Sequence, residues 1–259
     1  MTGSHAAYVL GPLLPAWLAV ALFSLGGLTF PIMAFLVVEG YRHTSNLRRY
    51  ASRLLLFALI SQIPYSLLWG AAGNVLITLT LGLACVYAVD RVSSPVLKAA
   101  AVIVATLASA PCDWGVLGPL LICLFHVKRD EGSRGVAVCM ALPLAVLGLP
   151  AMGYLVSLLN GQTLFFEPAA SPSQVAMLAN VGLPTIAHAT LIGDAMLTLP
   201  ASIVAMGEAG YALAGLPCAA LLIMGYRGSR GRPLKWFFYF YYPLHLFLLW
   251  AIGVVAYGG

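Results

Sequence analysis

The feature that most restricts the fold of this chain is a series of apolar runs along most of its length. Several runs contain about 20 residues with few charges, enough for one helix to cross the hydrocarbon layer of a bilayer. Backbone groups in lipid must hydrogen-bond within the protein, so only helices or a closed barrel can span it. Continuous rather than alternating apolar runs exclude the barrel. We therefore predict an all-α, polytopic transmembrane helical bundle.

The apolar runs predict about eight to ten membrane segments, all within a single integral membrane domain that covers residues 1–259. The stretch between Gln174 and Met224 is interrupted by Pro184 and Pro200, and it either crosses several times or is partly re-entrant. The expected segments are 16–38, 47–69, 74–89, 96–110, 116–127, 136–159, material within 174–224, and 234–257.

Composition supports a membrane environment and argues against a nucleic-acid partner. Only 8% of the residues are charged, whereas a soluble domain has about 25%. The 13 Lys and Arg residues collect in four short clusters, at 42–53, 91–98, 128–134 and 227–235. Such clusters between apolar runs mark cytoplasmic loops. The net charge of +5 is thus explained by topology, with the lipid bilayer as the partner.

The cysteines and the N-terminus carry no further signal. Five cysteines are scattered without paired spacing, so we expect neither disulfides nor a metal site. The apolar N-terminus lacks a basic region in front of it, so we expect no cleavable signal peptide.

Ionisable groups within membrane segments are costly and usually face a cavity or a partner. His245 lies about ten residues into the last segment, roughly 15 Å along its axis from the basic loop. It is either a structural histidine bonded to a neighbouring helix, or a base or substrate-binding donor, since its ordinary pKa of about 6.5 suits proton transfer. His188 and Asp194, in the interrupted stretch, are weaker candidates.

Two polar groups lie on the side opposite the basic clusters. Asp113 and Trp114 occupy a turn, where a helix N-cap and an interfacial anchor would explain them structurally. Asn74 and Thr78 are one helical turn apart and share a face, a pattern typical of contacts between helices.

The basic cluster after the first segments has two explanations. Arg42 and His43 follow Glu39, and Arg49 and Arg53 begin the next segment. Topology and an ion pair of Glu39 would account for these charges. Alternatively, the arginines hold the phosphates of a donor such as coenzyme A, which Arg binds through bidentate hydrogen bonds.

Several motifs, taken in order, resemble the TraX family, the pilin acetylases of conjugation systems and their chromosomal relatives. The resemblance covers about 30–125 and 235–250, and no motif stands out between 128 and 232. Its elements are FPIMAF at 30–35, EGYRHT at 39–44, YASRLLLFALISQIP at 50–64, NVL and TLTLG at 74–82, DWG at 113–115 and KWFFYFYYPLHL at 235–246.

The N-terminal part departs from the family pattern. Relatives usually have an Asp-His pair at the end of a full first helix, and here Ser4 stands before His5. This replacement removes a carboxylate that could orient the imidazole. Gly27 stands where the family often has arginine. A missing first helix, a partly lost site or a cloning remnant at residues 3–5 would each explain the start, and we favour a native His5.

The resemblance implies an acyltransferase of the bacterial inner membrane that takes acetyl from cytosolic acetyl-CoA and passes it to an amine or hydroxyl acceptor, such as a pilin N-terminus or an envelope glycan. On this view the two histidines converge on one cavity. The implied roles are catalysis by His5, His245 and Asp113, donor binding by Arg42, His43, Arg49 and Arg53, and substrate binding by Asn74, Thr78 and Trp114.

Two other classes of function remain open. A small-solute transporter would also bury a few polar groups in a helical bundle, although the inverted repeats that would favour it are not visible. A non-catalytic scaffold for pilus or envelope assembly is compatible with the replacements at Ser4 and Gly27.

Overall fold

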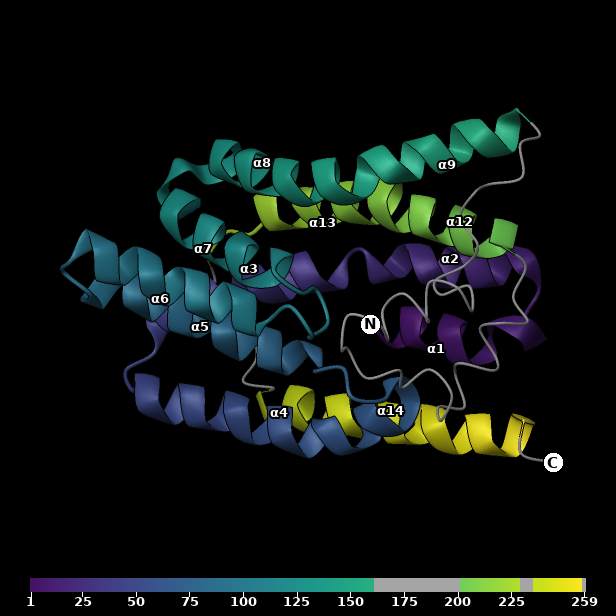
Figure 1. The fold of residues 1–259 in the computed structure, drawn as a ribbon, viewed down its shortest axis with the longest axis horizontal. Coiled ribbons are helices and arrows are strands. Elements are labelled where there is room, and N and C mark those ends of the chain that lie inside the picture. Colours follow the sequence, from purple (N-terminus) through teal and green to yellow (C-terminus); the bar gives the residue numbers. More distant parts are fainter. Residues whose placement is uncertain (161–200, 229–234, 258–259) are drawn as a thin grey trace, which may run out of the picture.

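A computed structural model describes residues 1–160, 201–228 and 235–257, which form a bundle of helices joined by turns (Figure 1). The predicted all-α membrane bundle is therefore confirmed. The helices are α1 (Thr2–Leu10), η1 (Gly11–Leu13), α2 (Ala16–Gly26), α3 (Thr29–His43), α4 (Leu47–Trp69), α5 (Val75–Arg91), α6 (Pro95–Ala108), α7 (Leu117–Lys128), η2 (Arg129–Glu131), α8 (Gly132–Pro143), η3 (Leu144–Gly148), α9 (Leu149–Leu159), α12 (Ala201–Gly210), η4 (Tyr211–Gly215), α13 (Leu216–Met224) and α14 (Lys235–Tyr257).

Five helical segments of the described residues are long and apolar enough to cross a bilayer. They are Ala16–His43, Leu47–Trp69, Leu117–Ser157, Ser202–Met224 and Trp236–Tyr257. The third is a hairpin, because the chain reverses at η2 and α8 packs against α7 (Figure 1). Gly132, with φ of 58°, provides the left-handed conformation at this reversal.

Local sequence signals fix where two helices begin. The Asn46 side chain accepts a hydrogen bond from the Arg49 amide at the start of α4. Ser94 does the same for α6, followed by Pro95 at the first helical position. Side-chain oxygens at this position satisfy amides that lack a partner within the helix.

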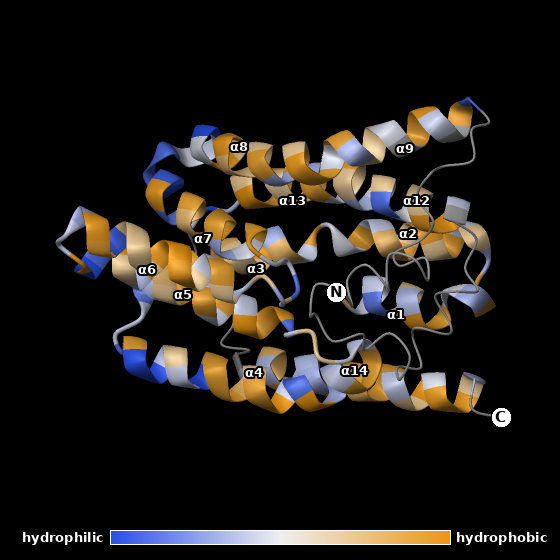
Figure 2. Cartoon of the chain, in the orientation of Figure 1, coloured by the Kyte–Doolittle hydropathy of each residue, from blue (hydrophilic) through white to orange (hydrophobic). Residues whose placement is uncertain are grey.

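Helix α4 shows the inverted surface of a membrane protein. Leu55, Leu59 and Ile63, spaced four residues apart, are 46%, 59% and 70% exposed. The opposite face, with Phe57 and Tyr65, is buried. Figure 2 shows apolar colours on the outward faces of many helices. An exposed apolar surface of this size is unfavourable in water, whereas it is favourable in contact with the hydrocarbon of a bilayer.

The basic residues lie at one end of the bundle. The connections from α3 to α4, from α5 to α6 and from α7 to α8 are all at this basic end, on the left of Figure 1. Figure 2 shows hydrophilic colours concentrated there. The rod formed by α12, η4 and α13 runs toward the same end and crosses once. Pro184 and Pro200 lie outside the described residues.

The centre of the bundle depends on a close contact between α2 and η4. At Gly27, where the rod of α2 and α3 is interrupted, a Cβ atom would overlap the Tyr211 carbonyl oxygen. The same hypothetical atom would lie 3.0 Å from the Cα of Gly215. Small residues let helices approach this closely in membranes. An arginine at this position would have no room in this packing.

Candidate functional site

The two predicted catalytic histidines lie in direct contact. His5 on α1 and His245 on α14 are 240 residues apart, and the His5 Nδ1 atom lies 3.1 Å from the His245 Nε2 atom. Their side chains are buried, and the two rings are nearly parallel. Trp69 of α4 packs against the His5 ring, with centroids 4.7 Å apart. Three helices therefore enclose this histidine pair.

The hydrogen bonds define which ring nitrogen is free. The His245 Nδ1 atom lies 2.9 Å from the Tyr241 backbone carbonyl, which can only accept, so His245 Nδ1 donates. In a neutral ring the His245 Nε2 atom is then the acceptor, and His5 Nδ1 donates to it. Of the ring nitrogens of these two histidines, only His5 Nε2 therefore has a lone pair free to accept a proton.

The Tyr241 side chain also stabilises the arrangement of the two histidines. Its ring stacks on His245 with a centroid distance of 5.2 Å. Its hydroxyl lies 2.6 Å from the Thr2 hydroxyl on α1. The hydrogen bonds of Tyr241 thus connect α14 to α1 next to the histidine pair, which restricts rotation of both rings.

A small cavity lies next to His5. Its volume is about 160 Å³, and its walls include His5, Ser4, Asp113, Trp114 and Tyr211. The Ser4 hydroxyl donates to the Met1 carbonyl at 2.9 Å, so it is not bonded to the imidazole. Asp113, in the turn between α6 and α7, instead brings a carboxyl to this cavity. Burial raises the pKa of the Asp113 carboxyl to about 6.

The Asp113 turn is fixed by two neighbouring segments. The Asp113 amide donates to the Gly73 carbonyl at 2.7 Å. The Thr78 hydroxyl donates to the Asp113 carbonyl. Trp114 adopts a left-handed φ of 66°, which is unfavourable for a bulky residue, and its ring stacks on Phe30 at 4.2 Å. Strain of this kind persists where the surroundings determine the conformation.

The explanation of Asp113 as a helix N-cap does not apply. The N-cap of α7 is Val116, without a side-chain hydrogen bond, so Asp113 does not cap that helix. Trp114 lines the small cavity and its ring stacks on Phe30. Its side chain therefore forms part of the small cavity.

Asn74 and Thr78 form hydrogen bonds that position segments around the candidate site. The fully buried Asn74 amide donates to the Ala58 carbonyl and the Gln62 side chain, both at 2.8 Å. Its oxygen accepts from the Leu76 amide at 3.0 Å. These bonds join α4 to α5 in the manner expected of polar contacts between helices. They favour a role in positioning over the direct substrate contact predicted for Asn74 and Thr78.

A larger cavity adjoins the small one. Its volume is about 680 Å³, and both cavities share the walls formed by Tyr8, Phe23, Asp113, Trp114 and Tyr211. The larger cavity also contains Glu208 of α12, which the sequence analysis did not single out. Glu208 could have been identified from the sequence, because a carboxylate inside an apolar segment is a functional candidate.

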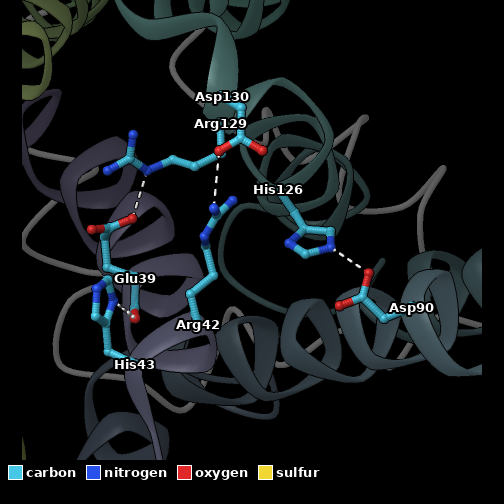
Figure 3. A network of polar contacts seen from close by, with 7 residues as sticks. All are labelled: Glu39, Arg42, His43, Asp90, His126, Arg129 and Asp130. Atoms are coloured by element: carbon cyan, nitrogen blue, oxygen red, sulfur yellow. Dashed lines mark hydrogen bonds and ion pairs between the residues drawn. The ribbon is translucent and has the colours of Figure 1, made fainter.

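The predicted donor site at the basic end is partly occupied by ion pairs (Figure 3). Glu39 pairs with Arg129, which provides the ion pair that the structural explanation required. Arg42 lies 2.9 Å from Asp130, and the His43 Nδ1 atom lies 2.9 Å from the Glu39 carbonyl. Two of the four predicted donor-binding residues thus have partners within the protein.

The other two predicted donor-binding residues lie on α4. Arg49 is exposed, and Arg53 is half-buried with an Nε atom that has no partner among the described residues. Nearby, the His126 Nε2 atom lies 2.7 Å from an Asp90 oxygen, which ties α7 to α5 (Figure 3). His188 and Asp194 lie outside the described residues.

Comparison with known proteins identifies the family of this chain. The model of the family described as TraX protein matches residues 1–191 and 187–253. The chain is 32% identical over 185 residues to a "Probable fimbrial assembly protein FimC, serogroup H1" of Dichelobacter nodosus, covering 65% of this chain and 69% of the relative. No solved structure matches. The chain therefore belongs to the TraX family.

Proposed function

We propose that this protein is a membrane acetyltransferase that acts in pilus or envelope assembly. The observation that carries the proposal is the buried pair of His5 and His245 beside a cavity that also receives the Asp113 carboxyl. Family membership supports the reaction class, and the name of the Dichelobacter nodosus relative supports a role in assembling fimbriae.

The proposed reaction uses His5 as the base. An amine or hydroxyl acceptor attacks the carbonyl carbon of acetyl-CoA, so a carbon–nitrogen or carbon–oxygen bond forms and the carbon–sulfur bond breaks. The proton of the acceptor passes to His5 Nε2 and then to the departing thiolate of coenzyme A. His245 accepts a hydrogen bond from His5 Nδ1, which leaves the lone pair on His5 Nε2, and His5 lines the small cavity.

This arrangement also accounts for a site without an aspartate before the histidine. In relatives with the Asp-His pair the carboxylate can orient the imidazole. Here the orienting groups are His245 and the Tyr241 carbonyl behind it. Because a carbonyl is neutral, the positive charge on a protonated His5 would have to be stabilised by Asp113, across the same cavity.

The donor is proposed to bind at the basic end. Arg49 is exposed, and the Asp130 side chain that pairs with Arg42 is 82% exposed. Exposed ion pairs contribute little to stability, so a phosphate could displace Asp130 from Arg42. Phosphate would gain charge-assisted hydrogen bonds from both arginines.

The first test is calorimetric binding of acetyl-CoA to the full chain purified in detergent. We expect saturable binding that Arg49→Ala weakens at least fivefold, whereas His245→Ala leaves it nearly unchanged. Lys98→Ala, which removes a basic residue from the first turn of α6 at the same end, is the matched control. Absence of binding by folded protein would overturn the enzyme proposal and favour a scaffold for assembly.

A further inference from the structure

The larger cavity contains a carboxylate that the proposed reaction does not use. Glu208 lies on α12, within the apolar segment Ser202–Met224. Its cavity-lining neighbours include the small residues Gly207 and Ala212, which leave space around it. A carboxylate in an apolar segment is retained only where a partner or a cavity offsets its cost in lipid. The cavity shows where such a partner would be.

The rim of this cavity is apolar. Val116 and Val146, which line it, are 43% and 50% exposed. Leu149 and Met206, which precede the lining residues Pro150 and Gly207 in sequence, are 72% and 47% exposed. Exposed apolar side chains on a membrane helix face hydrocarbon. A ligand with an apolar chain could therefore reach the cavity from within the bilayer.

The charge of the cavity favours one kind of head group. Among the described residues that line it, Asp113 and Glu208 are the ionisable acids, and none is lysine or arginine. Tyr8 and Tyr211 add hydroxyl groups. An ammonium group can donate hydrogen bonds to carboxylates and to tyrosine oxygens, and it complements the negative charge. An anionic head group would be repelled.

We propose that the larger cavity binds the acceptor, and that Glu208 selects a primary amine attached to an apolar chain over an alcohol of the same shape. The inference rests on the proposed function only in calling the ligand an acceptor. The shared wall at Asp113 and Trp114 connects this binding site to the small cavity and His5. Glu208 is accordingly a binding residue, and His5 remains the group that accepts the proton.

The test uses two photoreactive probes, an alkyl amine and the alkyl alcohol of equal length, each carrying a diazirine on the chain. The full chain in lipid nanodiscs is irradiated with each probe, and the labelled peptides are identified by mass spectrometry. We expect the amine probe to label residues 146–151 or 205–212 at least fivefold more than the alcohol probe does. Glu208→Gln should abolish this preference, whereas Glu208→Asp should retain part of it.

Glu131→Gln, an exposed carboxylate at the basic end, is the matched control and should leave the preference intact. Thermal unfolding of each variant shows whether it is folded. Equal labelling by both probes, or an unchanged preference in folded Glu208→Gln, would overturn the inference. Because the labelling requires neither acetyl-CoA nor turnover, it can succeed even if the acetyltransferase proposal fails, and it can fail while acetyl-CoA still binds.

Discussion

The ring nitrogens of His5 and His245 differ in chemical role, because only the His245 ring is hydrogen-bonded to a backbone carbonyl. Tyr241 fixes the proton on His245 Nδ1, and the contact between the rings then leaves His5 Nε2 as the available base. The two histidines are thus chemically unequal although both are buried and on helices.

This inequality predicts different effects of matched substitutions. His5→Gln should lower acetyl transfer to a primary amine by about 10²-fold or more, since it removes the general base. His245→Gln should cost less, because a glutamine oxygen can still accept from His5 Nδ1. The release of coenzyme A thiol measures both rates. Equal losses in two folded variants that still bind acetyl-CoA would contradict these separate roles.

Asp113 predicts a pH dependence of stability. Burial raises the pKa of its carboxyl to about 6, whereas the unfolded value is about 3.9. Between these values the folded state binds more protons, so the free energy of unfolding falls as the pH rises from about 4 to 6. Asp113→Asn cannot ionise and should lose this slope.

The variant should therefore be more stable than the parent at pH 7.5, by at most about 3 kcal/mol, and nearly equal to it at pH 4. Thermal unfolding in detergent at both pH values provides the measurement. Glu131→Gln, which changes an exposed carboxylate at the basic end, is a control for general charge effects. A constant difference between the Asp113 variant and the parent at all pH values would show that its ionisation is not linked to folding.

At the scale of elements, the break between α2 and α3 determines how closely α12 and η4 approach the site. Gly27 meets the backbone of Tyr211 and Gly215 there. Tyr211 in turn lines both cavities. The position of the cavity wall therefore depends on a glycine that carries no chemistry of its own.

Gly27→Ala should destabilise the protein by about 1–3 kcal/mol, because the added methyl group overlaps backbone atoms that cannot rotate away. The melting temperature should fall by several degrees. Gly153→Ala on α9, where a Cβ would meet nothing within 4 Å, is the matched control. It should be neutral or stabilising, since alanine favours helix over glycine. Unchanged melting of Gly27→Ala would show that this contact is looser than described.

At the scale of the whole molecule, the basic connections among the described residues lie at one end, which predicts its orientation. The rod of α8, η3 and α9 covers Gly132–Leu159, about 42 Å at 1.5 Å per residue. Hydrocarbon is about 30 Å thick, so the two ends of this rod must face opposite sides. Positive charge at the η2 end predicts that this end faces the cytoplasm.

Single cysteines at Ser133 and Asn160, both exposed, test this orientation in an otherwise cysteine-free chain. In intact spheroplasts an impermeant maleimide should label Asn160→Cys and not Ser133→Cys. Permeabilised cells should show labelling of both. The reverse pattern in intact spheroplasts would mean that the basic end faces outward and that a cytosolic donor could not reach Arg49.

The sequence by itself determined the fold class and most helix boundaries, because lipid allows few alternatives to a helix for an apolar run. The expected segments 74–89 and 116–127 correspond to Val75–Arg91 and Leu117–Lys128. It also indicated His245 as a candidate, since ionisable groups are rare in such segments, and the family resemblance added His5.

Only the tertiary structure decided which of those groups meet. His5 and His245 are in contact across 240 residues, and no periodicity in one segment predicts which face of a distant helix it will oppose. The same holds for Asn74, whose polar atoms are used within the bundle, and for Glu208, whose importance depends on a cavity built by other helices. Lipid determines that each segment is a helix, whereas the close packing of side chains between helices determines where each polar group is placed.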